Sequence, residues 1–538
     1  MTFFSLLYEN QQEQQVNRSE SWLKFKTSRK DKSQNNYEYV GSRLVKVNGK
    51  QEKKFYPAFF EALNLESIMH EIYDEETYSQ IEKVLTHFLP TEKDVYYRQG
   101  IFKALEEPEC YGAFLKFWNA IQQIKQVMAY SEKAQYSEQN DSYWLQAIVI
   151  YCKAVEKLKG FLENHPIEAE GINRLKNLLT AYTSTPDFVQ LKQESYSLKK
   201  QVEAITYTLD VEKSKVWVHS GRKATNYTLE LARLLGGDEE DYFINRRGDV
   251  TLNSLENRIL SVLIKENEGI FNHCHKFVES HKSFKAEFMV TMEEELLFYL
   301  KYIDYMNKLK QKGFQFCYPK LTQKKVLHIE GLYDLSLASQ KQSVKEMVTS
   351  ELDINENEHG ACITGANQGG KTTFIRGLGQ LIYQTALGYP VAAHKAEVFL
   401  YERIYTQFAE PENQHTENGK LKEELIGLEE TLKTVNDKSL VLINELFAST
   451  TMEDGRELGE KTIHQLVEKD ATVFFVTHII SLAKETQGLI SLVAEVREGE
   501  RCYRMIRKAV DGEAYTQQII AKYHLSYKEI KERLTGAN

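Results

Sequence analysis

The eight residues from Gly365 to Thr372 constrain the fold of this chain more than any other segment, because they read Gly-Ala-Asn-Gln-Gly-Gly-Lys-Thr. The apolar run before them, residues 361–364, is predicted to be a strand, and residues 374–378 are predicted to begin a helix. A glycine-rich turn between a strand and a helix points backbone N–H groups at an anion. The sequence therefore predicts an α/β domain in which this loop binds phosphate groups.

The residue types in this loop suit a polyphosphate accompanied by a divalent cation. Glycines let the backbone turn tightly and keep side chains out of the path of the phosphates. Lys371 would reach the β- and γ-phosphates as a point charge, and the hydroxyl of Thr372 would hold Mg²⁺. ATP and Mg²⁺ are therefore the expected ligands. The predicted binding residues of the loop are Gly365, Asn367, Gly369, Gly370, Lys371, Thr372 and Thr373.

A second apolar run, residues 439–443, ends in Asn444 and Glu445. An acidic residue at the tip of a strand beside such a loop can polarise an attacking water, so Glu445 is predicted to be catalytic. Asn444 stands where an Asp would usually help to hold Mg²⁺ through its water shell, which removes a charge and keeps an oxygen acceptor. We expect slow hydrolysis, with Mg²⁺ held by Thr372 through ATP and by Asn444 or Glu445 through water.

A third apolar run, residues 472–476, is followed by Thr477 and His478. His478 lies at the end of this predicted strand. It is predicted to be a catalytic residue that senses the γ-phosphate of ATP. Short runs rich in β-branched residues, including residues 326–329, are typical of an α/β domain with a buried sheet. The spacing of Leu421, Leu425, Leu428, Leu432 and Val435 predicts one amphipathic helix between the first two motifs.

The rest of the chain predicts long helices and no membrane span. Proline and glycine are scarce from about residue 58 to residue 312, whereas residues 9–54 are polar. Nowhere do about 18 apolar residues run together, as a membrane helix requires. The net charge of −9 does not favour nucleic acid overall, and it leaves room for a locally basic surface. Six scattered cysteines without CxxC spacing predict reduced thiols in a cytoplasmic protein.

Several motifs together resemble the MutS family of DNA mismatch-repair ATPases, which are relatives of the ABC ATPases. The loop 365–373 resembles the family's Gly-Pro-Asn-Met-Gly-Gly-Lys-Ser-Thr. Residues 444–455, NELFASTTMEDG, resemble its Asp-Glu-Leu-Gly-Arg-Gly-Thr-Ser-Thr-x-Asp-Gly, and residues 476–478 are similar to its Ala-Thr-His. The resemblance extends loosely upstream and spans roughly residues 55 to 535.

The resemblance implies a multidomain fold in which a long, mostly α-helical core and lever with a helical clamp precedes an α/β P-loop ATPase domain of the ABC/MutS type. We expect an N-terminal arm over residues 1–55. The core and lever would cover 56–335, with clamp-like helices inserted at about 165–285. The ATPase domain would cover 336–538 and end in dimerisation helices.

Three departures from the family pattern stand out. The family's signature Ser-Thr-Phe, which reaches the neighbouring subunit's γ-phosphate, aligns with Gly419-Lys420-Leu421, so the serine hydroxyl is missing. Gln407 stands where an arginine is usual. Too few residues precede the core for the family's N-terminal mismatch-reading domain, so we expect a relative without it.

By resemblance, DNA is the expected partner, contacted through its backbone or structure rather than its sequence. ABC-type sites are completed between two ATPase domains, which implies a homodimer. Downstream repair proteins are possible further partners. The candidate DNA-contacting residues are Lys199, Lys200, Lys213, Lys215, Trp217, Arg222, Lys223 and Tyr227. A solvated helical face is an equally good interpretation of these charges.

Two functions remain open at this point. The first is an ATP-hydrolysing, clamp-forming DNA-binding protein of the MutS type, acting in mismatch repair or related DNA repair or recombination control. The second is a dimeric module that ATP closes with negligible hydrolysis and that recruits partners. Lys371, Thr372, Glu445 and His478 favour the first function, whereas Asn444 and the missing signature serine favour the second.

Overall fold

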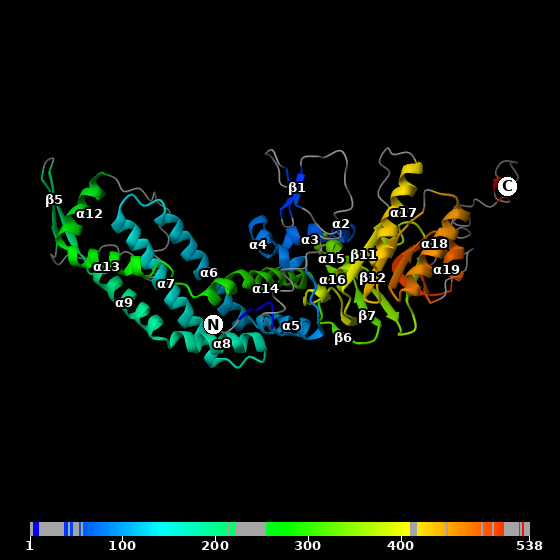
Figure 1. Ribbon diagram of the computed structural model, residues 1–538, viewed down its shortest axis with the longest axis horizontal. Helices are drawn as coiled ribbons and strands as arrows, with labels where there is room; N and C mark the ends of the chain where they lie inside the picture. The colour runs from blue at the N-terminus through cyan, green and yellow to red at the C-terminus, as the bar shows by residue number, and fades with distance from the viewer. Residues whose placement is uncertain are drawn as a thin grey trace. The chain divides into compact units, whose positions relative to one another are not determined.

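The computed structural model describes residues 4–9, 37–40, 43–46, 53–54, 58–212, 215–220, 254–408, 417–447, 450–485, 488–497, 500–509, 527 and 530–531. The chain forms two compact units (Figure 1). Unit 1 consists of Met1–Lys103 and Leu297–Asn538, and unit 2 consists of Ala104–Leu296. Helices α5 (Glu92–Glu106) and α14 (Glu287–Gln311) each begin in one unit and end in the other.

Unit 2 is mostly helical, as the scarcity of proline and glycine predicts. Pro108 and Pro186 stand at the start of α6 and α9, where the fixed φ of proline suits a helix and its missing N–H costs nothing. Helices α6 and α7 pack against each other. The hairpin β4-β5 adds two strands within the range 165–285, for which clamp-like helices are predicted. The elements are α6 (Pro108–Ser131), α7 (Ser137–Asn164), α8 (Glu170–Thr183), α9 (Pro186–Glu203), β4 (Tyr207–Glu212), β5 (Lys215–Ser220), α12 (Ser254–Glu266) and α13 (Glu268–Ser280).

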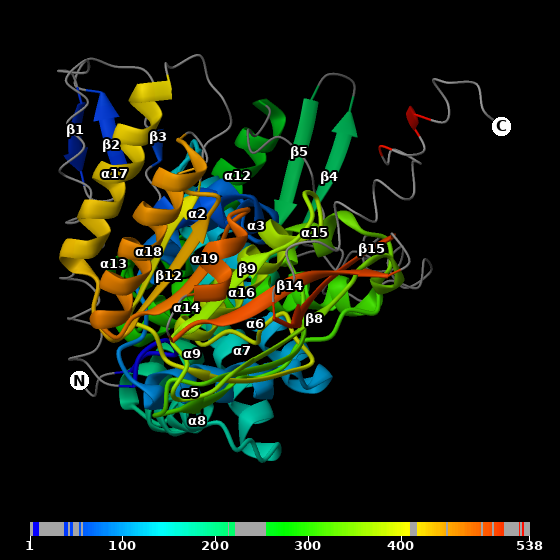
Figure 2. The same cartoon turned by 90° about the vertical axis from the view of Figure 1, so that its right-hand side faces the viewer.

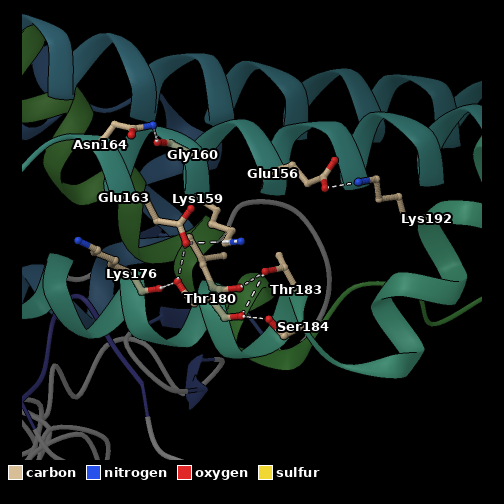
Figure 3. A network of polar contacts seen from close by, with 11 residues as sticks. Glu156, Lys159, Gly160, Glu163, Asn164, Lys176, Thr180, Thr183, Ser184 and Lys192 are labelled. Atoms are coloured by element: carbon tan, nitrogen blue, oxygen red, sulfur yellow. Dashed lines mark hydrogen bonds and ion pairs between the residues drawn. The ribbon is translucent and has the colours of Figure 1, made fainter.

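Polar contacts join the surfaces of neighbouring helices in unit 2 (Figure 3). Lys192 of α9 pairs with Glu156 of α7, and Thr180 of α8 donates a hydrogen bond to Glu163 of α7 at 3.3 Å. Lys159 pairs with the same Glu163 at 3.4 Å along α7. Exposed ion pairs of this kind contribute at most about 1 kcal/mol each, so the buried apolar faces of the helices supply most of the stability.

Helices α5 and α14 contact a short N-terminal segment, residues 4–9. Leu6 of this segment is fully buried, and Tyr299 of α14 donates a hydrogen bond to its carbonyl oxygen at 2.5 Å. Arg98 of α5 donates from Nε to the carbonyl oxygen of Leu7 at 2.9 Å. Strands also occur within the predicted arm. These strands form a three-stranded sheet, β1-β2-β3. The first elements of unit 1 are β1 (Tyr37–Val40), β2 (Arg43–Lys46), β3 (Lys53–Lys54), α2 (Ala58–Ala62), α3 (Leu65–Ile72) and α4 (Glu75–Leu85).

A six-stranded sheet forms the centre of the C-terminal part of unit 1, in the order β11-β12-β13-β9-β14-β15. Its first five strands are parallel, and β15 is antiparallel to β14. The strands predicted at 361–364, 439–443 and 472–476 are confirmed as β9, β12 and β13. The strands are β9 (Gly360–Thr364), β11 (Arg403–Phe408), β12 (Ser439–Asn444), β13 (Thr472–Val476), β14 (Ile490–Arg497) and β15 (Glu500–Arg507).

Helices cover both faces of this sheet, which explains why its central strands are apolar at nearly every position. Val441 and Ile443 of β12 point to one face, where they pack with Leu428 of α17 and Ile463 of α18. Leu442 points to the other face, toward α16. Figure 2 shows α17 and α18 together beside β12. The predicted amphipathic helix is confirmed as α17. The helices are α16 (Lys371–Ala386), α17 (Glu417–Thr434), α18 (Met452–Glu468) and α19 (Ile480–Glu485).

Unit 1 also contains a four-stranded sheet, in the order β6-β10-β7-β8. Its strand β7 confirms the strand predicted at 326–329. Among the described residues, no helix combines the length and the apolar character that a membrane crossing requires. The elements are β6 (Lys320–Thr322), β7 (Leu327–Leu332), α15 (Leu335–Gln340), η2 (Val344–Glu346), β8 (Ser350–Ile354) and β10 (Lys395–Phe399).

Candidate functional site

The predicted phosphate-binding loop joins the end of β9 to the start of α16, in the strand–loop–helix order that the sequence predicts. Gly365 has a φ of 124° and Gly370 a φ of 92°, values that favour glycine. A Cβ atom at Gly365 would lie 2.7 Å from the Cβ of Ala494, and one at Gly370 would lie 3.1 Å from the carbonyl oxygen of Tyr503. The two glycines therefore let the loop lie close to β14 and β15.

Lys371 is buried and turns back onto the loop. Its Nζ donates hydrogen bonds to the carbonyl oxygens of Gly365 at 2.9 Å and Ala366 at 3.1 Å. Burial lowers the pKa of Lys371, and the nearby charge of Glu445 opposes that shift. The first N–H groups of α16 have no partners within the helix and carry its positive dipole end. The loop thus presents an ammonium group and backbone donors suited to an anion.

Thr372 and Asn444 bring two oxygen atoms together beside the loop. The Thr372 hydroxyl donates a hydrogen bond to Oδ1 of Asn444 at 3.4 Å. Mg²⁺ prefers oxygen ligands and is usually held by one or two protein oxygens together with substrate phosphates. Among the described residues there is no group of three His, Cys, Asp or Glu side chains that could hold a metal ion alone. The oxygen atoms of Thr372 and Asn444 fit a cation that arrives with phosphates, as expected for Thr372.

Glu445 and His478 meet at neighbouring strand ends. Asn444 of β12 lies opposite Val476 of β13, and the N–H of Glu445 donates to the carbonyl oxygen of Val476 at 3.0 Å. Nε2 of His478 lies 2.7 Å from Oε1 of Glu445. The hydrogen bond to His478 lowers the pKa of Glu445 most strongly; burial opposes it, and the charge of Lys371 lowers the pKa further. Glu445 is thus an ionised carboxylate held beside the lysine of the loop.

A pocket of about 320 Å³ adjoins the loop and was not predicted from the sequence. Met347 and Val348 contribute apolar side chains, and Tyr503 of β15 lies at the pocket with about half of its surface exposed. Tyr503 has a φ of 55°, which is unusual for an aromatic residue. Local pattern gave no sign of the pocket, because its walls come from β7, α15, β8, α16 and β15. Its lining is Leu332, Tyr333, Asp334, Leu337, Lys341, Glu346, Met347, Val348, Ser350, Gly370, Thr373, Phe374, Gly377 and Tyr503.

The other residues of the predicted loop also have defined places. Asn367 is exposed at the tip, and Gly369 is buried with its N–H donating to the carbonyl oxygen of Ala366 at 3.0 Å. Thr373 lines the pocket. Gln407, which replaces the family's arginine, donates from Nε2 to the carbonyl oxygen of Gly427 at 3.0 Å and so joins β11 to α17.

The predicted partner-contacting residues are only partly described. Trp217 exposes about half of its side chain on β5, and Lys199 pairs with Glu203 at 3.6 Å on α9. Lys200 is exposed near the end of the same helix. Four of the predicted residues lie outside the described residues: Lys213, Arg222, Lys223 and Tyr227. The side chain of Lys215 and most of the predicted dimerisation helices lie outside them too.

Comparison with known proteins points to one family. The family model for MutS domain V matches residues 361–523. The DNA mismatch repair protein MutS of Syntrophomonas wolfei is 28% identical over 29% of this chain and 18% of its own length. The MutS of Clostridium kluyveri is 24% identical over 49% of this chain and 30% of its own length. The DNA mismatch repair protein MSH3 of Eremothecium gossypii is 25% identical over 34% of this chain and 19% of its own length.

The chain spans less than a third of the length of each of these relatives. The matched segment begins inside β9, one residue after the strand starts, and contains the loop, Glu445 and His478. The domain match and the relatives together identify residues 361–523 as a MutS-family domain.

Proposed function

We propose that this protein binds ATP with Mg²⁺ at residues 365–373 of a P-loop ATPase domain and hydrolyses it to control binding to DNA. The observation that carries the proposal is the meeting of Lys371, Glu445 and His478 at one edge of the sheet. The loop follows β9, and Glu445 and His478 follow the parallel strands β12 and β13. Ligands of open parallel sheets bind outside the carboxyl ends of the strands, which supports a site here.

In this proposal the pocket binds the base of ATP and the loop binds its phosphates. The base would enter the pocket against Met347 and Val348, with Tyr503 at its edge. The phosphates would follow the loop toward Lys371, whose ammonium group would exchange the carbonyl oxygens of Gly365 and Ala366 for phosphate oxygens. Because a phosphate oxygen carries negative charge and a carbonyl oxygen does not, the ammonium group would bind phosphate more strongly, and the exchange favours binding.

For hydrolysis, Glu445 would orient and deprotonate the attacking water. Its carboxylate is ionised, and His478 fixes one of its oxygens while the second oxygen remains to accept a proton. Lys371 would stabilise charge on the transferred phosphoryl group. Thr372 and Asn444 are the residues that would hold Mg²⁺, which when bound neutralises charge on the phosphates.

The second candidate function is an ATP-closed recruitment module with negligible hydrolysis. Asn444 favours it, because a neutral amide oxygen lies 3.4 Å from the Thr372 hydroxyl where a carboxylate would attract a cation more strongly. Steady-state ATPase assays on the wild type, Glu445→Gln and Asn444→Asp separate the two functions. Turnover in the wild type that Glu445→Gln abolishes supports the enzyme. Turnover only in Asn444→Asp supports the module.

DNA binding and dimerisation are proposed from the family. The relatives are named DNA mismatch repair proteins, and we propose that this chain, as a homodimer with two facing ATPase domains, contacts the backbone of DNA. We also propose the domain limits expected from the sequence: an arm over 1–55, a core and lever over 56–335 with a clamp at about 165–285, and an ATPase domain over 336–538. Binding to homoduplex, mismatched and branched DNA, measured with and without ATP over a salt series, tests it. Failure to bind any of them would remove the DNA claim and leave the nucleotide site standing.

A further inference from the structure

The turn that follows β12 has an unusual backbone. Glu445 and Phe447 both have positive φ angles, 57° and 65°. Residues with a Cβ rarely adopt this conformation, and a bulky aromatic residue is especially disfavoured there. Such a backbone persists only where the surrounding structure holds it in place. Residues 445–447, which we call the Glu445 turn, therefore require partners that fix them.

Hydrogen bonds hold the backbone of the Glu445 turn at both ends, and a further one runs from the N–H of Thr450 to the carbonyl oxygen of Phe447 at 3.4 Å. The N–H of Glu445 donates to the carbonyl oxygen of Val476 at 3.0 Å. The N–H of Phe447 donates to Oε2 of Glu424, on α17, at 3.2 Å. The side chains of Leu446 and Phe447 are buried in the apolar cluster between the sheet and helices α17 and α18. Glu424 is thus the one side chain among these contacts that fixes the turn through its backbone.

We propose that Glu424 is a positioning residue for Glu445, an inference that rests on the proposed ATPase function. The Cα and side chain of Glu445 lie along the chain between its own N–H and the N–H of Phe447, both of which are hydrogen-bonded. The Oε1 atom of Glu445 lies 2.7 Å from Nε2 of His478. Without Glu424, the Phe447 N–H loses its acceptor and Phe447 can relax toward negative φ. That rotation changes the direction of the neighbouring peptide and moves the carboxylate of Glu445 relative to His478.

The chemistry of residue 424 predicts a graded series of variants. A carboxylate accepts an N–H hydrogen bond more strongly than a neutral amide does. A glutamine still places an oxygen acceptor at the same distance along the side chain, whereas an alanine places none. Glu424→Gln should therefore retain most of the function of the turn, and Glu424→Ala should lose it. Glu423, the exposed neighbour on the same helix, supplies a matched control.

Steady-state ATP hydrolysis is the first measurement. Glu424→Ala should lower kcat by about tenfold or more while KM for ATP changes by less than about twofold, because the loop and the pocket are left intact. Glu424→Gln should stay within about threefold of the wild-type kcat, and Glu423→Ala should match the wild type. Equal kcat values in Glu424→Ala and Glu423→Ala would overturn the proposal. A loss that glutamine does not rescue would also overturn it.

A second measurement reads the position of Glu445 without nucleotide. In protein labelled with ¹⁵N-histidine, His478→Gln assigns the imidazole signals of His478, and Glu445→Gln shows where they move when the carboxylate is removed. We expect Glu424→Ala to shift these signals toward their Glu445→Gln positions, and Glu424→Gln and Glu423→Ala to leave them unchanged. Unmoved signals in Glu424→Ala would contradict positioning.

The two measurements can contradict the proposed ATPase function and the positioning role of Glu424 separately. If the wild type neither binds nor hydrolyses ATP, the proposed function is wrong, and the imidazole signals still decide whether Glu424 positions Glu445. If the wild type hydrolyses ATP and Glu424→Ala keeps both its kcat and its His478 signals, the positioning role is wrong and the proposed function stands. Matching thermal unfolding of Glu424→Ala and Glu423→Ala establishes that any loss of kcat is local.

Discussion

Nε2 of His478 lies 2.7 Å from Oε1 of Glu445 and joins the tips of β13 and β12. This bond is the largest contribution to the lowered pKa of Glu445. Their side chains are 42% and 36% exposed, so solvent screens the pair and its effect on global stability is small. Because the folded-state pKa of Glu445 is lowered, that small stabilisation is present above the pKa of the unfolded chain and disappears as pH falls through the folded-state pKa. The larger consequence concerns the pH range in which Glu445 can act as a base.

Replacement of His478 should narrow that range. In His478→Ala, the pKa of Glu445 rises because its main hydrogen bond is gone, so the acidic limb of the kcat profile should move to higher pH. The measurement is kcat for ATP hydrolysis over a pH series. His464→Ala removes an exposed histidine of α18 that pairs with Glu468, and it should leave the limb where it is. Identical limbs in the two variants would show that the bond to His478 does not control the protonation of Glu445.

Lys371 should contribute to ATP binding and not to the stability of the nucleotide-free protein. Burial lowers its pKa, which means that burying the charged amine is unfavourable in the absence of phosphate. Lys371→Met should therefore unfold at the same temperature as the wild type or a higher one. A saturating ligand at about 100 times its Kd stabilises a protein by about 2.7 kcal/mol, so ATP should raise the unfolding temperature of the wild type clearly.

Thermal unfolding with and without Mg²⁺-ATP tests this expectation, and Lys371→Met should lose the ATP-dependent shift. The control is Lys461→Met, an exposed lysine of α18 that is part of neither the pocket nor the loop, which should keep the full shift. A full ATP-dependent shift in Lys371→Met would contradict the assigned role of the lysine.

Local pattern predicted the parts of the site that lie within single segments, and it missed the parts assembled from distant ones. The glycine-rich loop, the strands before Glu445 and His478, and helix α17 each have a pattern of their own. Glu424 was not predicted as a functional residue, because a carboxylate on an amphipathic helix looks like any exposed charge. Tyr503 and the pocket depend on β15 lying against the loop. Such contacts follow from the sheet order, which no local periodicity encodes.

The buried polar contacts that connect α16 to the rest of unit 1 could not be predicted either, because they too join residues that are distant in the sequence. Gln380 is fully buried and makes three hydrogen bonds, all to residues distant in the sequence. Its Nε2 donates to the carbonyl oxygen of Leu63 at 2.8 Å and to Oδ1 of Asp334 at 2.9 Å, and its Oε1 accepts from the N–H of Leu335 at 2.7 Å. The helix that begins at the phosphate-binding loop is thereby bonded to the end of α2 and the start of α15.

Gln380→Leu should destabilise unit 1 by roughly 3 kcal/mol, because each buried polar group left without a partner costs about 1 to 3 kcal/mol. Denaturant unfolding, followed by hydrogen exchange of peptides from unit 1, measures the change. Gln342→Leu makes the same chemical change at an exposed position and should be nearly neutral. A Gln380→Leu variant as stable as Gln342→Leu would show that the protein repacks around the lost amide.

Arg98 should hold the N-terminal segment in place. It is almost fully buried, and its guanidinium donates from Nε to the carbonyl oxygen of Leu7 at 2.9 Å and from Nη1 to that of Leu387, at the end of α16, at 3.0 Å. The same group lies over the rings of Tyr8 and Phe298, with its Cζ 5.3 Å and 5.2 Å from their centroids. A lysine has neither the planar shape nor the paired donors to replace these contacts.

We therefore expect Arg98→Lys to cost roughly 2 to 4 kcal/mol in local stability, from two lost hydrogen bonds to buried carbonyl groups. Residues 4–9 should then exchange their amide hydrogens faster, which hydrogen exchange with mass spectrometry of the N-terminal peptide measures. Lys93→Ala supplies the contrast: Lys93 is 73% exposed and its partner Glu9 is 10% exposed, so loss of this pair should speed exchange less than loss of the two buried contacts of Arg98. Equal exchange rates for residues 4–9 in both variants would mean that the buried side chains of Leu6 and Leu7 hold the segment without Arg98.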